Sequence, residues 1–131
     1  MALNLKIQSL PHYLLMVYEG HFDGSCIEQL INEVLEACEK YKPVKLMADF
    51  RTVTGTMTTM ERFELGSVFA LRYMGKRMAG KILSCQFAFV GSYPLIDPRR
   101  FGETVAKNRG INVMAFTDMD KGVKWLENEE K

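Results

Sequence analysis

Short apolar runs and longer amphipathic stretches alternate along this chain, and that alternation restricts the possible folds more than any other feature. Two strand-like segments, residues 3–9 and 12–19, come first, and each later apolar run is followed by a helical pattern. The later runs cover residues 44–50, 82–90 and 111–116. Strands that alternate with helices of ten residues or more pair in parallel through right-handed crossovers. The sequence therefore predicts an α/β domain in the order β-β-α-β-α-β-α-β-α.

The first two strands are expected to pair differently from the rest. Only a short turn containing Pro11 separates them, so the first strand should run antiparallel to the second. The largely apolar run 44–50 is typical of a strand that is buried on both faces. We expect a mixed five-stranded sheet with about four helices, which form one layer on the sheet.

Length and composition favour one domain that spans residues 1–131. A chain of 131 residues forms one hydrophobic core and is too short for two. Its net charge of +1 gives no reason to expect a nucleic-acid partner. The N-terminus lacks the features of a signal peptide, and no run approaches the roughly 20 apolar residues of a membrane span. A cytoplasmic location is the expectation.

Cysteine and histidine do not form a metal-binding pattern in this sequence. The three cysteines are far apart, without a CxxC pair, and the chain has two histidines. Zinc sites need about four such ligands at close spacing. We expect reduced thiols, no metal and no cofactor.

Capping residues mark where several helices begin and end. Either Ser25, with Glu28 three residues later, or Asp23 caps the first helix. Thr58 or Thr59 begins a long helix that runs to about residue 78, which Gly80 then closes. Asp97-Pro98 and Asp118 are the start signals of the last two helices.

Several segments, taken together, carry a resemblance to a known family. They are Asp49–Gly55, Thr58–Gly66, Asp97–Ala106, Asn108–Gly110, Phe116–Asp118 and Trp125–Leu126. In this order, over nearly the whole chain, they resemble the SpoIIAA-like family of bacterial STAS-related proteins. The resemblance implies a mixed sheet flanked by helices, no established catalytic activity, and a role in binding small molecules or lipids.

The better-known cousins within this resemblance are the anti-sigma-factor antagonists. The resemblance implies that they bind a partner kinase and are switched by phosphorylation of a serine. That serine lies in an Asp-x-Ser-Gly motif that opens the helix after the third strand. Here the corresponding stretch, residues 54–59, reads Thr-Gly-Thr-Met-Thr-Thr and contains no Ser-Gly pair. The phosphorylation switch is therefore not carried over to this chain.

The long helix from residue 58 to 78 is the main candidate for a binding element. One apolar stripe runs through Met60, Phe63, Ser67, Leu71, Met74 and Met78, and a neighbouring one through Leu65, Phe69 and Tyr73. Together they exceed the arc of about 100° that packing on one sheet requires. Either the helix is a thick core helix, or it lines a pocket for an apolar or amphipathic ligand or covers a homodimer or partner face. The candidate ligand-binding residues are Met60, Phe63, Phe69, Tyr73 and Met74.

Polar residues at the two ends of this helix provide further candidates. Thr56, Thr58 and Thr59 lie near its N-terminus, where they form an anion site or serve as ordinary caps. Arg72, Lys76 and Arg77 lie near its C-terminus. They complement the helix dipole, or they hold a lipid headgroup and make transient contact with a membrane surface.

A thiol-dependent enzyme is the weakest hypothesis. Cys26 lies near a helix N-terminus with His21 close in sequence, but the sequence offers neither an orienting third group nor an oxyanion motif.

The main hypothesis is a non-catalytic STAS-like module that binds a small apolar or lipid-like ligand at the helix 58–78. The alternative is a protein-interaction module related to the anti-sigma-factor antagonists.

Overall fold

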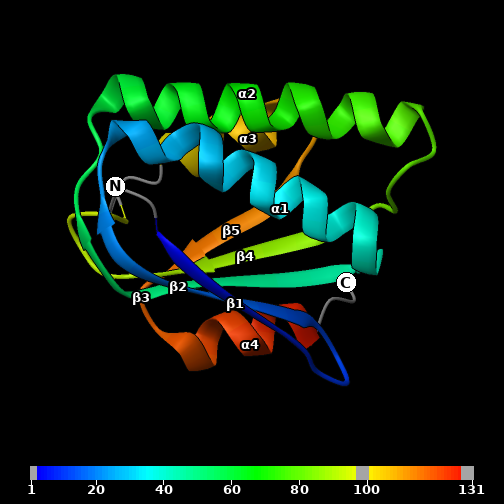
Figure 1. The fold of residues 1–131 in the computed structure, drawn as a ribbon, viewed down its shortest axis with the longest axis horizontal. Helices are drawn as coiled ribbons and strands as arrows, with labels where there is room; N and C mark the ends of the chain where they lie inside the picture. The colour runs from blue at the N-terminus through cyan, green and yellow to red at the C-terminus, as the bar shows by residue number, and fades with distance from the viewer. Residues whose placement is uncertain (1–2, 97–100, 128–131) are drawn as a thin grey trace.

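The computed structural model describes residues 3–96 and 101–127, which form one sheet with helices on both faces (Figure 1). Along the chain the elements are β1 (Asn4–Ser9), β2 (Leu14–Phe22), the 3₁₀ turn η1 (Gly24–Cys26), α1 (Ile27–Tyr41), β3 (Lys45–Gly55), α2 (Thr59–Met78), β4 (Gln86–Val90), α3 (Phe101–Asn108), β5 (Asn112–Phe116) and α4 (Met119–Glu127). The predicted order of strands and helices is confirmed. The predicted helix start at Asp97-Pro98 lies outside the described residues.

The five strands lie in the sheet in the same order as in the sequence, β1-β2-β3-β4-β5. β1 pairs antiparallel with β2, and the other neighbours pair in parallel. One row across the parallel strands joins Leu14, Leu46, Phe87 and Val113, all of them buried. The predicted mixed sheet with an antiparallel first strand is confirmed.

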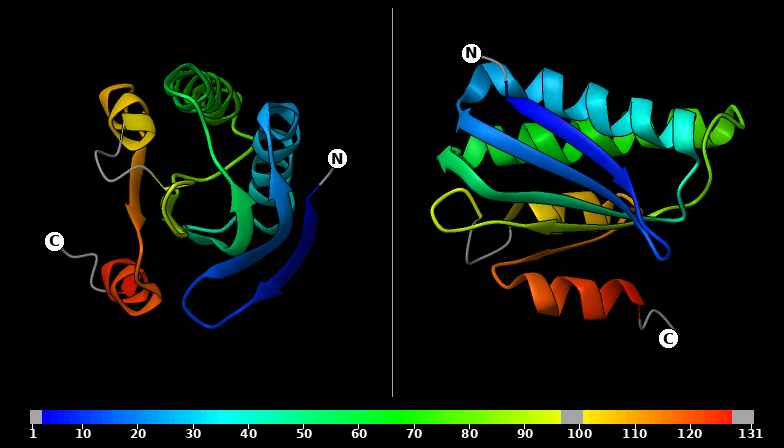
Figure 2. Two further views of the ribbon diagram at one scale, coloured as in Figure 1. Left: turned by 90° about the vertical axis from the view of Figure 1, so that its left-hand side faces the viewer. Right: turned by 60° about the horizontal axis from the view of Figure 1, so that its bottom comes forward.

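Helices cover both faces of the sheet, so the expectation of a single helical layer is wrong. Helices α1, α2 and α3 lie side by side on one face, and α4 crosses the other (Figures 1 and 2). The physical reason is that the central strands are apolar on both sides. Leu46 and Ala48 face the larger core under α1 and α2, whereas Met47 joins Leu126 in a smaller core under α4. Without α4 that second face would lie open to water.

Strand β3 is longer than the sequence predicts, because it continues through a threonine-rich stretch that reads as a loop. Residues Thr52–Gly55 pair with Glu19–Phe22 of β2. Threonine is β-branched and suits a strand, so tertiary pairing with β2 overrides the polar composition. The strand ends at Gly55, whose φ is 109°. A Cβ there would lie 2.4 Å from the carbonyl oxygen of Phe22, so only glycine fits this turn.

Of the two predicted caps for the first helix, Asp23 caps the 3₁₀ turn η1 that precedes α1, and the N-cap position of α1 itself is Cys26. The Asp23 carboxylate accepts a hydrogen bond from the backbone N–H of Ser25, at 2.9 Å, and the chain then enters η1 and α1.

Among the described residues, no helix combines the length and apolar character needed to cross a bilayer.

Candidate ligand-binding cavity

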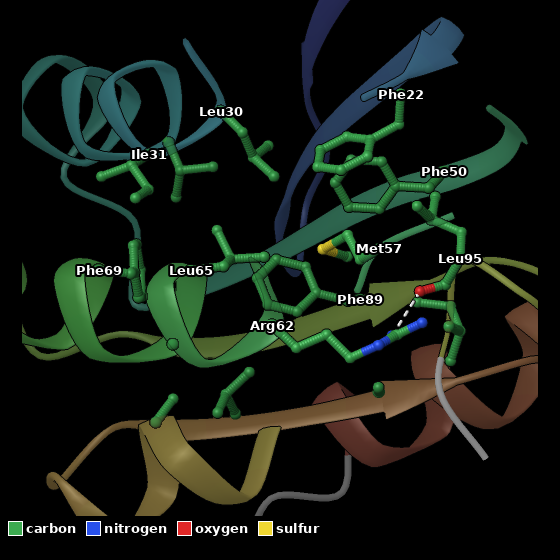
Figure 3. Close-up of a pocket in the computed structure, with 16 residues that line it drawn as sticks. Phe22, Leu30, Ile31, Phe50, Met57, Arg62, Leu65, Phe69, Phe89 and Leu95 are labelled. Atoms are coloured by element: carbon green, nitrogen blue, oxygen red, sulfur yellow. Dashed lines mark hydrogen bonds between the residues drawn. The ribbon is translucent and has the colours of Figure 1, made fainter. Parts of the chain in front are cut away.

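An apolar cavity of about 100 Å³ lies between the sheet and the helices α1 and α2 (Figure 3). Four strands, three helices and two connecting segments contribute to its wall. The lining residues are Phe22, Leu30, Ile31, Val34, Phe50, Met57, Arg62, Leu65, Gly66, Phe69, Phe89, Leu95, Ile96, Ala106, Val113 and Ala115. The cavity is partly enclosed, and its wall is almost entirely hydrocarbon.

The topology of the sheet places this cavity toward the carboxyl end of the parallel strands. Phe22 is the last residue of β2, and Met57 lies just beyond the end of β3. Phe89 is the second-last residue of β4. Because parallel strands point the same way, their carboxyl ends meet at one edge, where open α/β sheets usually bind ligands. The position of the cavity therefore agrees with the usual binding edge of this class of fold.

Aromatic side chains form the floor of the cavity. The ring of Phe50 stacks on Tyr18, with 5.0 Å between centroids, and lies 6.0 Å from the ring of Phe89. On the helical side, Phe69 meets Phe87 edge to face at 5.2 Å. Contacts of this kind add to the free energy gained from burial and hold the rings in place. The cavity is thus bounded by side chains that are fixed by their neighbours.

Arg62 is the one charged residue among the described residues that line the cavity. Its guanidinium group donates hydrogen bonds to the carbonyl oxygens of Leu95 and Pro94, each at 2.8 Å (Figure 3). These bonds fasten the segment after β4 to helix α2. A guanidinium group carries five N–H donors, and these two bonds use one donor on each of its two terminal nitrogens.

Sequence reasoning missed Arg62, although the sequence contains a signal for it. Arg62 precedes Leu65, Phe69 and Tyr73 at spacings of three, four and four residues, so it lies on the inner stripe of α2. A cation on the buried face of an amphipathic helix marks a functional-site candidate more clearly than cations near its solvated end.

The five predicted ligand-binding residues of α2 do not gather at one site. Phe69 and Tyr73 are buried, but of these two only Phe69 lines the cavity. The hydroxyl of Tyr73 accepts a hydrogen bond from the backbone N–H of Cys85, at 2.9 Å, which anchors the helix to the start of β4. Met60, Phe63 and Met74 lie outside the cavity lining and are exposed.

Of the three predicted threonines at the start of α2, Thr58 caps the helix. The hydroxyl of Thr58 accepts a hydrogen bond from the backbone N–H of Glu61, and the Glu61 carboxylate accepts one from the backbone N–H of Thr58. This reciprocal pair is a capping box. Thr56 precedes the box and Thr59 lies within it, and both are exposed.

Two of the three predicted basic residues form ion pairs with helix α1. Arg72 lies 2.5 Å from the carboxylate of Glu28, and Lys76 pairs with Glu39. The hydrogen bond from Lys76 holds the pKa of Glu39 below its usual value. Arg77 is exposed. Arg72 and Lys76 therefore tie α1 to α2, and the three predicted basic residues do not act as one basic patch.

The structure does not bring the residues of the thiol-enzyme hypothesis into a catalytic arrangement. The sulfur of Cys26 is 3.9 Å from the backbone carbonyl oxygen of His21. The His21 imidazole lies 2.9 Å from the Thr54 hydroxyl instead.

Within residues 3–96 and 101–127, no group of three or more His, Cys, Asp or Glu residues is arranged to hold a metal ion.

Comparison with solved structures identifies the class of fold. An anti-sigma factor antagonist from Mycobacterium paratuberculosis matches with a TM-score of 0.53 at 14% identity, covering 96% of this chain and 95% of the other. The unphosphorylated anti-sigma factor antagonist SpoIIAA matches with a TM-score of 0.50 at 10% identity, over 95% and 99%. A protein of the DUF3478 family with a SpoIIAA-like fold, from Shewanella loihica, matches with a TM-score of 0.50 at 17% identity, over 95% and 94%.

The chain therefore has the SpoIIAA-like fold, as its resemblance to that family predicts. No protein-family model matches it, and no curated protein matches it in sequence. Since identities of this size establish the fold alone, the function has to be argued from the cavity.

Proposed function

We propose that this protein is a non-catalytic SpoIIAA-like module that binds a small amphipathic anion, with the apolar tail in the cavity and the acidic head against Arg62. The observation that carries the proposal is the composition of the cavity wall. It is almost entirely hydrocarbon, and Arg62 is the one charged residue among the described residues that line it. Such a wall matches a ligand with an apolar body and one negative charge.

The volume of the cavity limits how much of a ligand it accepts. A cavity of about 100 Å³ is smaller than an apolar protein cavity of roughly 150 Å³ that takes up benzene. Each methylene group that enters gains about 0.8 kcal/mol. The ligand is therefore a short acyl chain or a compact ring, bound with modest affinity, and a longer tail extends into solvent.

Met57 is the residue best suited to adjust to different ligands. It lies in the connection between β3 and α2 and is only partly buried. The thioether side chain is flexible and polarisable, and it fills irregular gaps well. A module of this kind accepts several tails of similar size.

Calorimetric titration with octanoate and with 1-octanol tests the proposal. The wild-type protein is expected to bind octanoate more tightly than the alcohol, because only the carboxylate pairs with Arg62. Arg62→Gln should remove that preference. Leu65→Trp should fill the cavity and abolish binding of both ligands.

Met60→Trp is the matched control, since Met60 is on the same helix but 74% exposed. It should bind both ligands as the wild type does. Equal binding of octanoate by the wild type and by Leu65→Trp would exclude the cavity as the site.

A further inference from the structure

One part of the cavity wall is a single turn of chain with solvent on its outer side. Residues 92–96 follow β4, and two of them, Leu95 and Ile96, line the cavity. Leu95 is 4% exposed, whereas Tyr93 in the same turn is 72% exposed. Pro94, between them, is exposed as well. At this point the thickness of one chain segment separates the cavity from solvent.

The rest of the described wall is built from parts of the fold that open less readily. Apart from Met57, the other lining residues belong to four strands and three helices, whose backbone groups are paired in ladders and helical turns. The connection that carries Met57 is fixed one residue further on by the capping box of Thr58 and Glu61. Local opening takes the least free energy where a segment has few buried contacts. The turn 92–96 is therefore the part of the wall that a ligand passes most easily.

Arg62 fastens this turn to α2. One terminal nitrogen of its guanidinium group donates to the carbonyl oxygen of Leu95 and the other to that of Pro94, each at 2.8 Å (Figure 3). The planar guanidinium group presents its donors as a rigid fork, which suits two neighbouring acceptors. Hydrogen bonds from a charged donor are also roughly twice as strong as neutral ones. A side chain of α2 thus holds the backbone of the turn against the cavity.

Further contacts fix the start of the turn to the sheet. The backbone N–H of Gly91 donates to the carbonyl oxygen of Phe116 in β5, at 3.0 Å. A Cβ on Gly91 would lie 2.9 Å from a side-chain carbon of Ile96, so Ile96 packs directly over the glycine. The backbone N–H of Ile96 donates to the carbonyl oxygen of Ser92, at 3.0 Å, and closes the turn. The turn is thus anchored at its start, while its middle is held by Arg62.

From these contacts we propose that residues 92–96 form a lid over the cavity and that Arg62 is the latch that keeps the lid closed. When both carbonyl bonds break, the middle of the turn lifts and an apolar tail enters past Leu95. The inference rests on the proposed function, because it concerns the route into the same cavity. It adds that Arg62 sets the rate of ligand exchange, besides the preference for an acidic head.

Hydrogen–deuterium exchange of the ligand-free protein, resolved by NMR, tests the latch. The reporter is the backbone N–H of Ile96, which is bonded inside the lid. Arg62→Gln should speed its exchange by about tenfold or more, because the variant removes the group that makes both carbonyl bonds. The amides of β4 should exchange at wild-type rates, which shows that the domain as a whole has not loosened. Wild-type exchange at Ile96 in this variant would overturn the latch.

Two further variants separate the latch from the charge of Arg62. Arg62→Lys keeps a cation for the acidic head but lacks the fork, so it should prefer octanoate to 1-octanol and still speed exchange at Ile96. Arg109→Gln is the matched control. The Arg109 guanidinium group also donates to a backbone carbonyl oxygen, that of Val105 at 3.2 Å, but this acceptor lies in α3 and not in the lid. Its loss should leave exchange at Ile96 unchanged.

NMR line shapes of ¹³C-labelled 1-octanol measure how fast a ligand enters and leaves. Both the association rate and the dissociation rate should rise in Arg62→Gln, because easier opening speeds passage in both directions. The loss of a binding contact alone would raise only the dissociation rate, and that result would overturn the lid. A wild-type protein that bound no 1-octanol would instead overturn the proposed function, and the lid with it.

Discussion

Phe69 and Leu71 are two residues apart on α2, yet the structure predicts very different roles for them in stability. Phe69 is 6% exposed and touches the rings of Phe87 and Tyr73, at 5.2 and 6.1 Å, whereas Leu71 is 75% exposed. Replacing a buried phenylalanine by alanine typically costs about 3–5 kcal/mol. We expect the upper half of that range for Phe69→Ala, because its deletion enlarges an existing cavity and also removes two aromatic contacts. Leu71→Ala should change the free energy of unfolding by less than about 0.5 kcal/mol.

Urea unfolding followed by circular dichroism measures both changes. For a domain of this size, the free energy of unfolding lost in Phe69→Ala corresponds to a melting temperature lowered by roughly 10–20 °C. If the two variants differed by less than about 1 kcal/mol, the side of α2 assigned to the core would be wrong.

Three further predictions concern other parts of the fold. Gly122→Ala should destabilise the protein by about 1–3 kcal/mol in urea unfolding, because a Cβ at this position would lie 2.9 Å from the methyl group of Met47 and 3.1 Å from a methyl group of the stiffer, β-branched Val90. An unchanged midpoint would mean that α4 does not approach the sheet this closely. Arg51→Gln should lower the free energy of unfolding by about 1–3 kcal/mol, because Asp49, which is 5% exposed, accepts two side-chain hydrogen bonds from Arg51, at 3.0 and 2.9 Å. A variant that melts at the wild-type temperature would refute this. Hydrogen bonding with the Cys38 thiol, together with burial, raises the pKa of Cys85 far above its usual value. Iodoacetamide should therefore modify Cys85 only in denaturant, and rapid alkylation of Cys85 in the native protein would contradict its buried position.

The strand–helix order could be predicted from the sequence because it depends on local periodicity. The antiparallel first strand followed from the short turn at Pro11, and the parallel pairing followed from the helices between the later strands. What the pattern left open was the face on which each helix packs. Trp125 and Leu126 indicate an amphipathic helix, but only the packing of Leu126 against Met47 shows that α4 covers the second face.

The candidate site was harder to predict, because α2 has two apolar stripes and the sequence does not say which one faces inward. The contacts that decide it are tertiary. Tyr73 bonds to the backbone of Cys85, and Phe69 meets Phe87, whereas Met60 and Met74 find no such neighbour among the described residues. The cavity itself arises where side chains from β2 to β5 fail to fill the space under α2, and no sequence period reports unfilled volume.

Native mass spectrometry of the protein mixed with straight-chain carboxylates, from hexanoate to dodecanoate, tests the central claim most directly. The measured masses give both the number of carboxylates bound to each chain and the length of their tails. The account predicts one carboxylate per chain of the wild type, with a preference for the shorter tails, and none for Leu65→Trp. A wild-type protein that remains ligand-free, or that retains the same carboxylates when the cavity is filled, would contradict the claim that this module binds amphipathic anions under α2.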